Sequence, residues 1–323
     1  MKHCVYALIT LCGLASSVCL AQDQYPVKPI RMIVGFPPGG LADILSRTVA
    51  QHMTKTLDQQ VLVENRAGAG GTIGARIVAK SPPDGYTLLM GALASQSIAP
   101  SVYRDLPYDT NRDFTPVSKV AEHCLVLVVN PSLPVKDVRG LVALAKARPG
   151  QLNYGSGGIG SSQHLATEYF SMQAGIKMVH VPYKGSPLVL GDLISGQLAL
   201  SVGIPSTVLP HARSGKLRAL AVTSPRRWPG LSELPTIAEA ASLPNFSVVG
   251  WFGVVGPAGL PSDVVTRLNR EIGRSLSLPD VKQQLSERGV EAASSTPQEF
   301  GDLIRSDTVK YARIAKAAGM KPN

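Results

Sequence analysis

The chain has 323 residues, of which 44% are hydrophobic and 17% are charged, and its formal net charge is +10. These proportions are typical of a packed globular protein and do not suggest a disordered chain, and the length suits two domains of ordinary size or one large domain. The lysines and arginines are scattered along the chain without an aromatic-rich basic stripe, so we expect no nucleic-acid partner.

The N-terminus has the pattern of an export signal. Lys2 belongs to a short polar start, an almost uninterrupted apolar run covers residues 5–14, and small residues lead up to Ala21. The apolar run is shorter than the roughly 20 residues that a membrane span needs, whereas the small residues suit a cleavage site. We therefore predict a signal peptide over residues 1–21, cleaved after Ala21. Loss of Lys2 then lowers the net charge from +10 to +9.

The cysteines predict no disulfide. Cys4, Cys12 and Cys19 leave with the signal, and only Cys124 remains in the mature chain. It begins the apolar run 124–129, which reads as a buried strand. We interpret Cys124 as an inert core thiol, because a reactive cysteine needs an exposed, electropositive environment.

Strand-like and helix-like segments alternate along the mature chain, which predicts parallel sheets with helices on their faces. Short apolar runs mark the strands, and apolar residues at helical spacing mark the helices. In chain order, the predicted elements are a strand at 30–34, a helix at 41–57, strands at 60–63 and 86–90 with a helix at 73–79 between them, a strand at 151–154, a helix at 162–173, a strand at 178–182, a helix at 188–193, strands at 198–202 and 217–222, and helices at 262–276, 280–288 and 297–318.

Two long β-rich runs interrupt this alternation, at 117–129 and at 246–255. Each is long enough to pass from one lobe of a protein to another. We therefore expect an α/β, two-lobed clamshell with two β-strand crossovers. The first lobe is expected to comprise residues 22–122 plus 250–323, and the second residues 123–249. In such folds the ligand lies between the lobes, at the carboxyl ends of the strands.

The first informative loop, GFPPGGLAD at 35–43, joins a predicted strand to a predicted helix. Gly39 and Gly40 let the backbone approach a ligand closely, and the helix start presents free N–H groups with a partial positive charge. Such a loop holds an anion without lysine or arginine. The alternative is a tight strand-to-helix turn in which Asp43 complements the helix dipole.

The second loop, GSGGIGSS at 155–162, has the same strand-to-helix context and adds serine hydroxyls. His164, in the first turn of the next helix, either contacts ligand, faces solvent or caps the helix. The letters also satisfy the G-x-G-x-x-G dinucleotide fingerprint. The next strand, however, ends in VPYKG at 181–185, without the acid that would hold a ribose. We therefore expect no dinucleotide and no other cofactor.

Signals for catalysis or a metal are missing from the sequence. It has no G-x-S-x-G elbow, no C-x-x-C and no H-E-x-x-H. His164 and Glu168 are spaced i, i+4, but two ligands are too few for a metal, and we interpret them as a surface pair. Glu122, His123 and Cys124 are adjacent, but strand alternation points their side chains to opposite faces. We expect no catalytic residue and no metal ligand, so the protein is not expected to be an enzyme.

Many ordered motifs together resemble the Bug family of periplasmic receptors, the TctC-like substrate-binding subunits of tripartite tricarboxylate transporters. The likeness covers nearly the whole mature chain. The matching segments are YPxKPIR at 25–31, FxPGGxxD at 36–43, VENRxGAGG at 63–71, PDGYT at 83–87, GSGGxGS at 155–161, HVPYKG at 180–185, GKLRALAVT at 215–223 and PAG at 257–259.

The resemblance implies a type II periplasmic-binding fold that holds a ligand carboxylate with backbone amides of both loops. It also implies that the segment 94–96 lines the same cleft. Together with His164 from the loop analysis, the expected ligand-binding residues are Phe36, Gly39, Gly40, Leu41, Ala42, Asp43, Ser95, Gln96, Ser156, Gly157, Gly158, Ser161 and Ser162.

The chain departs from the family pattern at three places. Family members often carry Thr or Asn with His near the positions of Ser95 and Gln96. Family members often carry an acid soon after the position of Gln197 and a polar or acidic residue before that of Pro205, where this chain has LAL at 198–200 and Ile204. An acid there would recognise a ligand amine. Its absence favours plain or aromatic carboxylates over amino acids.

The resemblance also implies how the protein is used. It predicts a periplasmic monomer that captures a small di-, tri- or aromatic carboxylate and docks on the membrane permease subunits. The alternatives are a ligand-sensing receptor for a signalling protein, or an enzyme that uses the same cleft.

Overall fold

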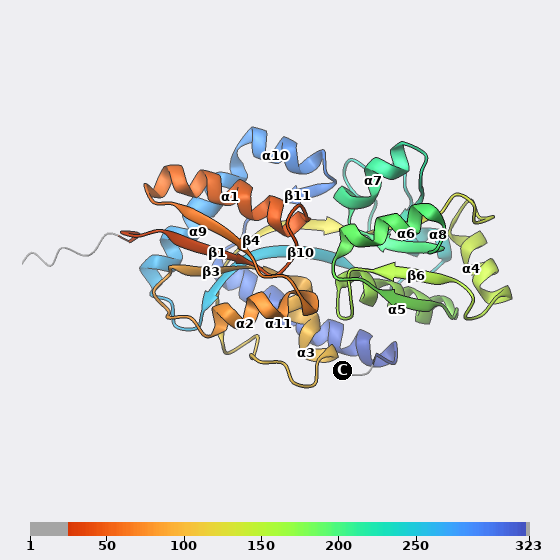
Figure 1. Cartoon of the computed structure of the whole chain (residues 1–323), viewed down its shortest axis with the longest axis horizontal. Coiled ribbons are helices and arrows are strands. Elements are labelled where there is room, and N and C mark those ends of the chain that lie inside the picture. Colours follow the sequence, from red (N-terminus) through yellow and green to blue (C-terminus); the bar gives the residue numbers. More distant parts are fainter. Residues whose placement is uncertain (1–24, 321–323) are drawn as a thin grey trace, which may run out of the picture.

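The computed structural model describes residues 25–320. The predicted signal peptide, with Cys4, Cys12 and Cys19, lies outside these residues. The described chain forms two lobes, each built on one sheet, which lie side by side along the long axis of the molecule (Figure 1). No helix within residues 25–320 combines the length and the apolar character that a membrane span requires.

The first sheet has six strands in the order β11-β4-β10-β3-β1-β2. The strands are β1 (Ile30–Val34), β2 (Val61–Asn65), β3 (Thr87–Ala92), β4 (Phe114–Cys124), β10 (Val249–Pro257) and β11 (Val290–Ala292). The helices of this lobe are α1 (Leu41–Leu57), α2 (Thr72–Ala79), α3 (Ala99–Val102), α9 (Ser262–Ser277), α10 (Pro279–Ser286) and α11 (Pro297–Ala317).

The second sheet has five strands in the order β7-β6-β8-β5-β9. All of them come from the middle of the chain. The strands are β5 (Val126–Val129), β6 (Asn153–Ser156), β7 (Val179–Pro182), β8 (Leu200–Gly203) and β9 (Arg218–Val222). The helices are α4 (Val138–Ala147), α5 (Ser162–Ala174), α6 (Val189–Ser195), α7 (Pro205–Arg213) and α8 (Ile237–Ala241).

The chain passes between the sheets at the two β-rich runs. Strand β4 ends at Cys124 in the first sheet, and β5 begins at Val126 in the second. Strand β10 brings the chain back into the first sheet, between β3 and β4. The α/β, two-lobed fold class is confirmed. The lobe limits of 22–122 plus 250–323 and 123–249 stay a prediction.

The expectation of parallel sheets was wrong in one respect. Strand β10 runs antiparallel to β3 and β4, and β5 runs antiparallel to β8 and β9. The reason is the crossover itself. Apart from β11, which runs antiparallel to β4 at the sheet edge, the other strands of both lobes carry their carboxyl ends toward the space between the lobes, so a strand that enters a sheet from that space must run against them.

The core is continuous across the two lobes. One cluster of buried side chains joins Ile33 and Leu89 of the first sheet to Leu127 and Tyr154 of the second. The C-terminal helix α11 contributes Tyr311 to it and packs against α5 of the other lobe. Figure 1 shows α11 running beneath the first sheet toward the second lobe. Cys124 is fully buried in a smaller cluster, and burial raises the pKa of its thiol to about 12, as an inert core cysteine requires.

Candidate functional site

A cavity lies between the lobes, where the carboxyl ends of the strands meet. It is lined by 21 residues from both lobes, contributed by the two glycine loops, the starts of α1 and α5, the end of β3, β4, β10, the loop before α6, and α7 with the residue before it. None of these residues is Lys, Arg, Asp or Glu, and His123 is the only ionisable side chain among them. A charged ligand here would therefore meet backbone and hydroxyl groups rather than a counter-ion.

The first glycine loop ends in a helix start with open donors. Gly40 is the N-cap of α1, in extended conformation, and no side chain caps this helix. The Gly39 amide donates to an Asp43 carboxylate oxygen at 3.0 Å, and the Gly40 amide donates to the Pro37 carbonyl at 3.4 Å. Among the described residues, the amides of Leu41, Ala42 and Asp43 have no acceptor. Leu41 and Ala42 line the cavity, so their N–H groups belong to its wall.

Asp43 supports this loop from behind, outside the cavity wall. Its buried carboxylate accepts hydrogen bonds from Arg47 Nε, from Asn65 Nδ2 at 3.0 Å and from the Gly39 amide. Burial acts to raise the pKa of Asp43, but these hydrogen bonds outweigh it and hold the pKa below its usual value. The carboxylate thus fixes the turn that positions the start of α1.

The amides of the second glycine loop are mostly paired within the chain. The Gly157 amide donates to Gln163 Oε1 at 2.7 Å, the Gly158 amide to Ser156 Oγ at 3.1 Å, and the Gly160 amide to His164 Nδ1 at 3.3 Å. Gly158 has φ +120°, and a Cβ there would lie 2.9 Å from the Tyr183 carbonyl oxygen. Because their amides already donate within the chain, these glycines contribute to the shape of the loop rather than to open donors.

The open donors of the second lobe lie at the start of α5. Ser161 is the N-cap, and its hydroxyl accepts from the His164 amide at 3.2 Å. Within the described chain, the amides of Ser162 and Gln163 have no acceptor. Both residues line the cavity, together with the hydroxyl-bearing Ser161 and Ser186. The helix starts of both lobes therefore present unpaired N–H groups to one cavity.

His164 is neither exposed nor part of the cavity wall. It lies behind the second loop, where its ring stacks on His180 with centroids 3.9 Å apart. Burial, with a smaller effect of His180, lowers the pKa of His164 to about 3, so Nδ1 is free to accept the Gly160 amide. The expected surface pair of His164 and Glu168 was wrong, because Glu168 instead accepts from the Tyr154 hydroxyl at 2.5 Å.

Ser95 and Gln96 also lie away from the cavity. They belong to a π-helical turn, Ala94–Ile98, and are fully buried. The Gln96 side chain packs next to Gly91, so that a Cβ there would be 3.1 Å from its Cγ. Of the segment 94–96, only Ala94 lines the cavity.

The structure thus divides the predicted ligand-binding residues into two equal sets by position. Seven line the cavity: Phe36, Gly40, Leu41, Ala42, Gly157, Ser161 and Ser162. The other seven support it from behind or lie deeper in the lobes: Gly39, Asp43, Ser95, Gln96, Ser156, Gly158 and His164.

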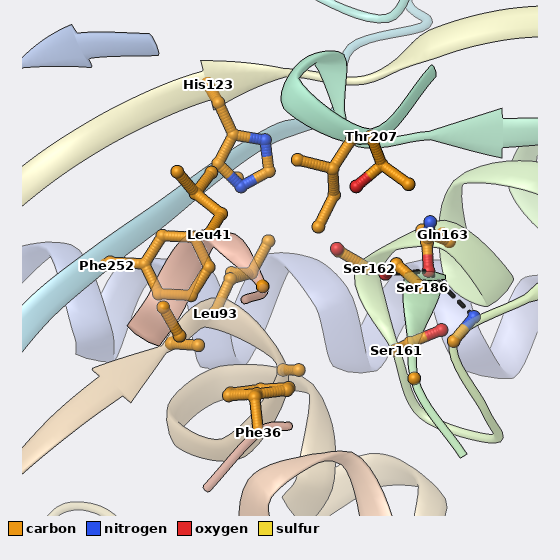
Figure 2. A pocket seen from close by; sticks show the side chains of 18 of the residues that line it. Phe36, Leu41, Leu93, His123, Ser161, Ser162, Gln163, Ser186, Thr207 and Phe252 are labelled. Atoms are coloured by element: carbon orange, nitrogen blue, oxygen red, sulfur yellow. Dashed lines mark hydrogen bonds between the residues drawn. The ribbon is translucent and has the colours of Figure 1, made fainter. Parts of the chain in front are cut away.

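Sequence reasoning missed the wall formed by the crossover strands. His123 on β4 and Phe252 on β10 line the cavity, and their rings stack with centroids 5.5 Å apart. Figure 2 shows them with Leu41 and Leu93 on one side of the cavity, while Ser161, Ser162, Gln163 and Ser186 lie on the other and Thr207 lies above these in that view. The sequence of this run gave no signal that singles out His123, because Ser118, Lys119 and Glu122 are also polar residues of the same strand.

Comparison with known proteins decides the family. The model of the tripartite tricarboxylate transporter family receptor, TctC, matches residues 45–320. The chain belongs to this family. It is also similar to the protein BugT of Bordetella pertussis, with 38% identity over 314 residues that cover 97% of this chain and 95% of BugT. The resemblance to Bug receptors is confirmed.

Solved structures of the same kind share the fold over almost the whole chain. Rpa4515 of R. palustris, solved with adipate, is 37% identical with a TM-score of 0.88, covering 93% of this chain and 100% of that one. The periplasmic binding protein BugD is 30% identical with a TM-score of 0.86 and the same coverage. MatC (Rpa3494) from Rhodopseudomonas palustris, with bound malate, is 29% identical with a TM-score of 0.83, covering 90% and 99%. The family and these neighbours are solute-binding receptors rather than enzymes.

Proposed function

We propose that this protein captures a small carboxylate between its two lobes and delivers it to the membrane subunits of a tripartite tricarboxylate-type uptake system. The observation that carries the proposal is the pair of helix starts that face one cavity. The amides of Leu41 and Ala42 on α1, and of Ser162 and Gln163 on α5, have no acceptor within the described chain. Helix N-termini with unpaired N–H groups bind anions.

The neutral wall strengthens this preference. No acidic side chain lines the cavity to repel an anion, and no basic one is needed, because two helix dipoles and several N–H groups converge. The apolar side of the cavity, with Phe36, Leu41, Leu93 and Phe252, offers contact for a carbon skeleton. Adipate in Rpa4515 and malate in MatC support carboxylates as the ligand class.

Ligand capture by lobe closure is part of the proposal. The two lobes face each other across the cavity and are joined by β4–β5 and β10, so rotation about these strands would open and close the cavity. We further propose export through the signal at 1–21, a periplasmic location, a monomeric state and no catalytic activity. Fractionation of cells that express the full chain tests the location: mature protein in the periplasmic fraction is expected, and cytoplasmic precursor would contradict it.

A matched ligand pair tests the carboxylate directly. Hexanoate and hexanamide share one skeleton and differ in charge and in one terminal group. The measurement is isothermal titration of the chain lacking residues 1–21. We expect hexanoate to bind one site per chain, at least ~10-fold more tightly than hexanamide, since a charge-assisted hydrogen bond contributes about 1.5–3 kcal/mol. Equal affinity for hexanamide would contradict the proposal.

A further inference from the structure

We propose that His123 determines ligand specificity by accepting a hydrogen bond at Nε2 from a neutral hydroxyl at the end of the ligand remote from its carboxylate. The preferred ligands are then hydroxy-monocarboxylates rather than dicarboxylates. This inference rests on the proposed function, because it takes the carboxylate to be held at the starts of α1 and α5.

The tautomer of His123 follows from its neighbour. Nδ1 lies 2.9 Å from the carbonyl oxygen of Cys124, and a carbonyl can only accept a hydrogen bond, so Nδ1 carries the proton. In a neutral ring Nε2 is then a bare acceptor. Burial lowers the pKa of His123 to about 4, which keeps the ring neutral at the pH of the periplasm or the cytoplasm.

The ring is held in one orientation. His123 pairs with Gly250 across β4 and β10, and a Cβ at position 250 would lie 2.4 Å from both Cε1 and Nε2. The other flank of the ring stacks on Phe252 at an interplanar angle of 28°. Because glycine leaves room on one side and phenylalanine supports the other, the acceptor keeps a fixed place in the cavity wall.

Nε2 is unsatisfied but not sealed in. None of the hydrogen bonds within the described chain uses it, and it is not among the polar atoms that are both unpartnered and fully enclosed. The serine hydroxyls and Gln163 lie on the opposite side of the cavity in Figure 2, with Thr207 above them in that view, and no hydrogen bond of the described chain joins Thr207 to His123. A ligand is therefore the natural source of a donor for Nε2.

The charged groups around His123 favour a neutral donor. On its own strand, Glu122 pairs with Lys119; on β11, Glu291 is in register with Glu122; on α11, Asp307 accepts from Trp251 Nε1 at 2.7 Å. None of these charged side chains lines the cavity. A ligand ammonium would find no carboxylate there, and a second ligand carboxylate would face the lone pair of Nε2 and would have to take up a proton.

Three six-carbon ligands separate these possibilities: 6-hydroxyhexanoate, hexanoate and adipate. By isothermal titration at pH 8, we expect 6-hydroxyhexanoate to bind about 3- to 10-fold more tightly than hexanoate, as one neutral hydrogen bond gives. At pH 8, 6-hydroxyhexanoate should also bind more tightly than adipate. Adipate should gain affinity on acidification to pH 5, where its second carboxyl is partly converted to a neutral donor, whereas 6-hydroxyhexanoate should gain no affinity, because its only carboxyl is the one held at the helix starts.

Two variants assign the effect to a residue. His123→Phe keeps a ring between Gly250 and Phe252 but removes the acceptor, so the two monocarboxylates should bind within about 2-fold of each other. Thr207→Val removes a different hydroxyl from the wall and should leave the preference intact. Thermal melting checks that each variant folds. Should His123→Phe not fold, the three-ligand comparison in the wild type, with its pH arm, still decides.

The outcomes separate the two proposals. The inference is overturned by equal affinities for the monocarboxylates in the wild type, by tighter binding of adipate at pH 8, or by loss of the preference in Thr207→Val instead of His123→Phe. In each of these cases hexanoate still binds better than hexanamide if the carboxylate proposal holds. Equal binding of hexanoate and hexanamide overturns the carboxylate proposal, and with it this inference.

Discussion

The imidazole of His123 lies across the Cα of Gly250, in the space that any side chain at position 250 would need. This pair joins the two crossover strands at the point where the chain leaves the first lobe and returns to it. The same contact shapes the apolar side of the cavity, so Gly250 links the two crossover strands to the cavity wall.

Gly250→Ala should displace this ring. A new Cβ would come within 2.4 Å of Nε2 and Cε1, and overpacking of a buried site costs about 1–3 kcal/mol. We expect the free energy of unfolding, measured by urea denaturation, to fall by that amount. Gly273→Ala is the matched control, because nothing lies within 4 Å of that added Cβ on α9 and alanine favours a helix. A Gly250→Ala variant as stable as the control would contradict the packing.

Ser161→Ala should combine two losses. Removing the N-cap of α5 costs about 1 kcal/mol of stability, and removing a hydroxyl from the wall weakens carboxylate binding. Thr236→Ala removes the N-cap of α8, which is outside the cavity wall, and should lower stability by a similar amount without changing affinity. If both variants lost affinity equally, the effect would come from general destabilisation rather than from the site.

Asp43→Asn should loosen the first loop although Asp43 does not line the cavity. The carboxylate accepts from Gly39, Arg47 and Asn65, and an amide in its place leaves at least one of these donors without an acceptor. We expect the free energy of unfolding to fall by about 1–3 kcal/mol and hexanoate to bind more weakly. Asp302→Asn, at an exposed ion pair with Arg305, is the control and should change neither quantity. Full affinity in Asp43→Asn would show that the loop needs no such support.

Acid should destabilise the protein before most carboxylates titrate. The pKa values of His123, His164 and His180 fall to about 4, 3 and 4 in the folded chain, from 6.5 when unfolded, mainly through burial. Between pH 6.5 and about 4 the unfolded chain binds protons that the folded chain does not, so the free energy of unfolding falls as the pH falls. The slope is about 1.4 kcal/mol per pH unit for each such histidine.

His123→Phe removes one of these groups and should flatten that slope. The measurement is the free energy of unfolding across pH 4–7.5 for the wild type and the variant. Identical slopes would contradict the buried neutral state of His123.

Hydrophobic periodicity in the sequence located most elements, and the glycine motifs between them located both loops. The helix predicted at 41–57 has those bounds in α1, and the β-rich runs at 117–129 and 246–255 lie at the crossovers. These features are local, because the pattern of neighbouring residues is enough to predict a helix face or a buried strand.

What sequence reasoning could not give is which donors remain open. The amides of Gly157 and Gly160 are consumed by Gln163 and His164, whose side chains fold back onto the loop. Likewise, His123 reaches the cavity because β10 places a glycine beside it, a pairing between strands more than 120 residues apart. Such contacts depend on tertiary packing rather than on local pattern.

The most direct test of the account removes one backbone donor from a helix start. Ser162 is the first residue of α5, a position that accepts proline, and Ser161 before it has the extended conformation that proline requires (φ −68°, ψ 154°). Ser162→Pro deletes the hydroxyl and the N–H, whereas Ser162→Ala deletes the hydroxyl alone. By isothermal titration with hexanoate, we predict that Ser162→Pro binds about 10-fold more weakly than Ser162→Ala, with both variants melting as one cooperative unit. Equal affinity of the two variants would contradict the claim that the helix-start amides hold the carboxylate.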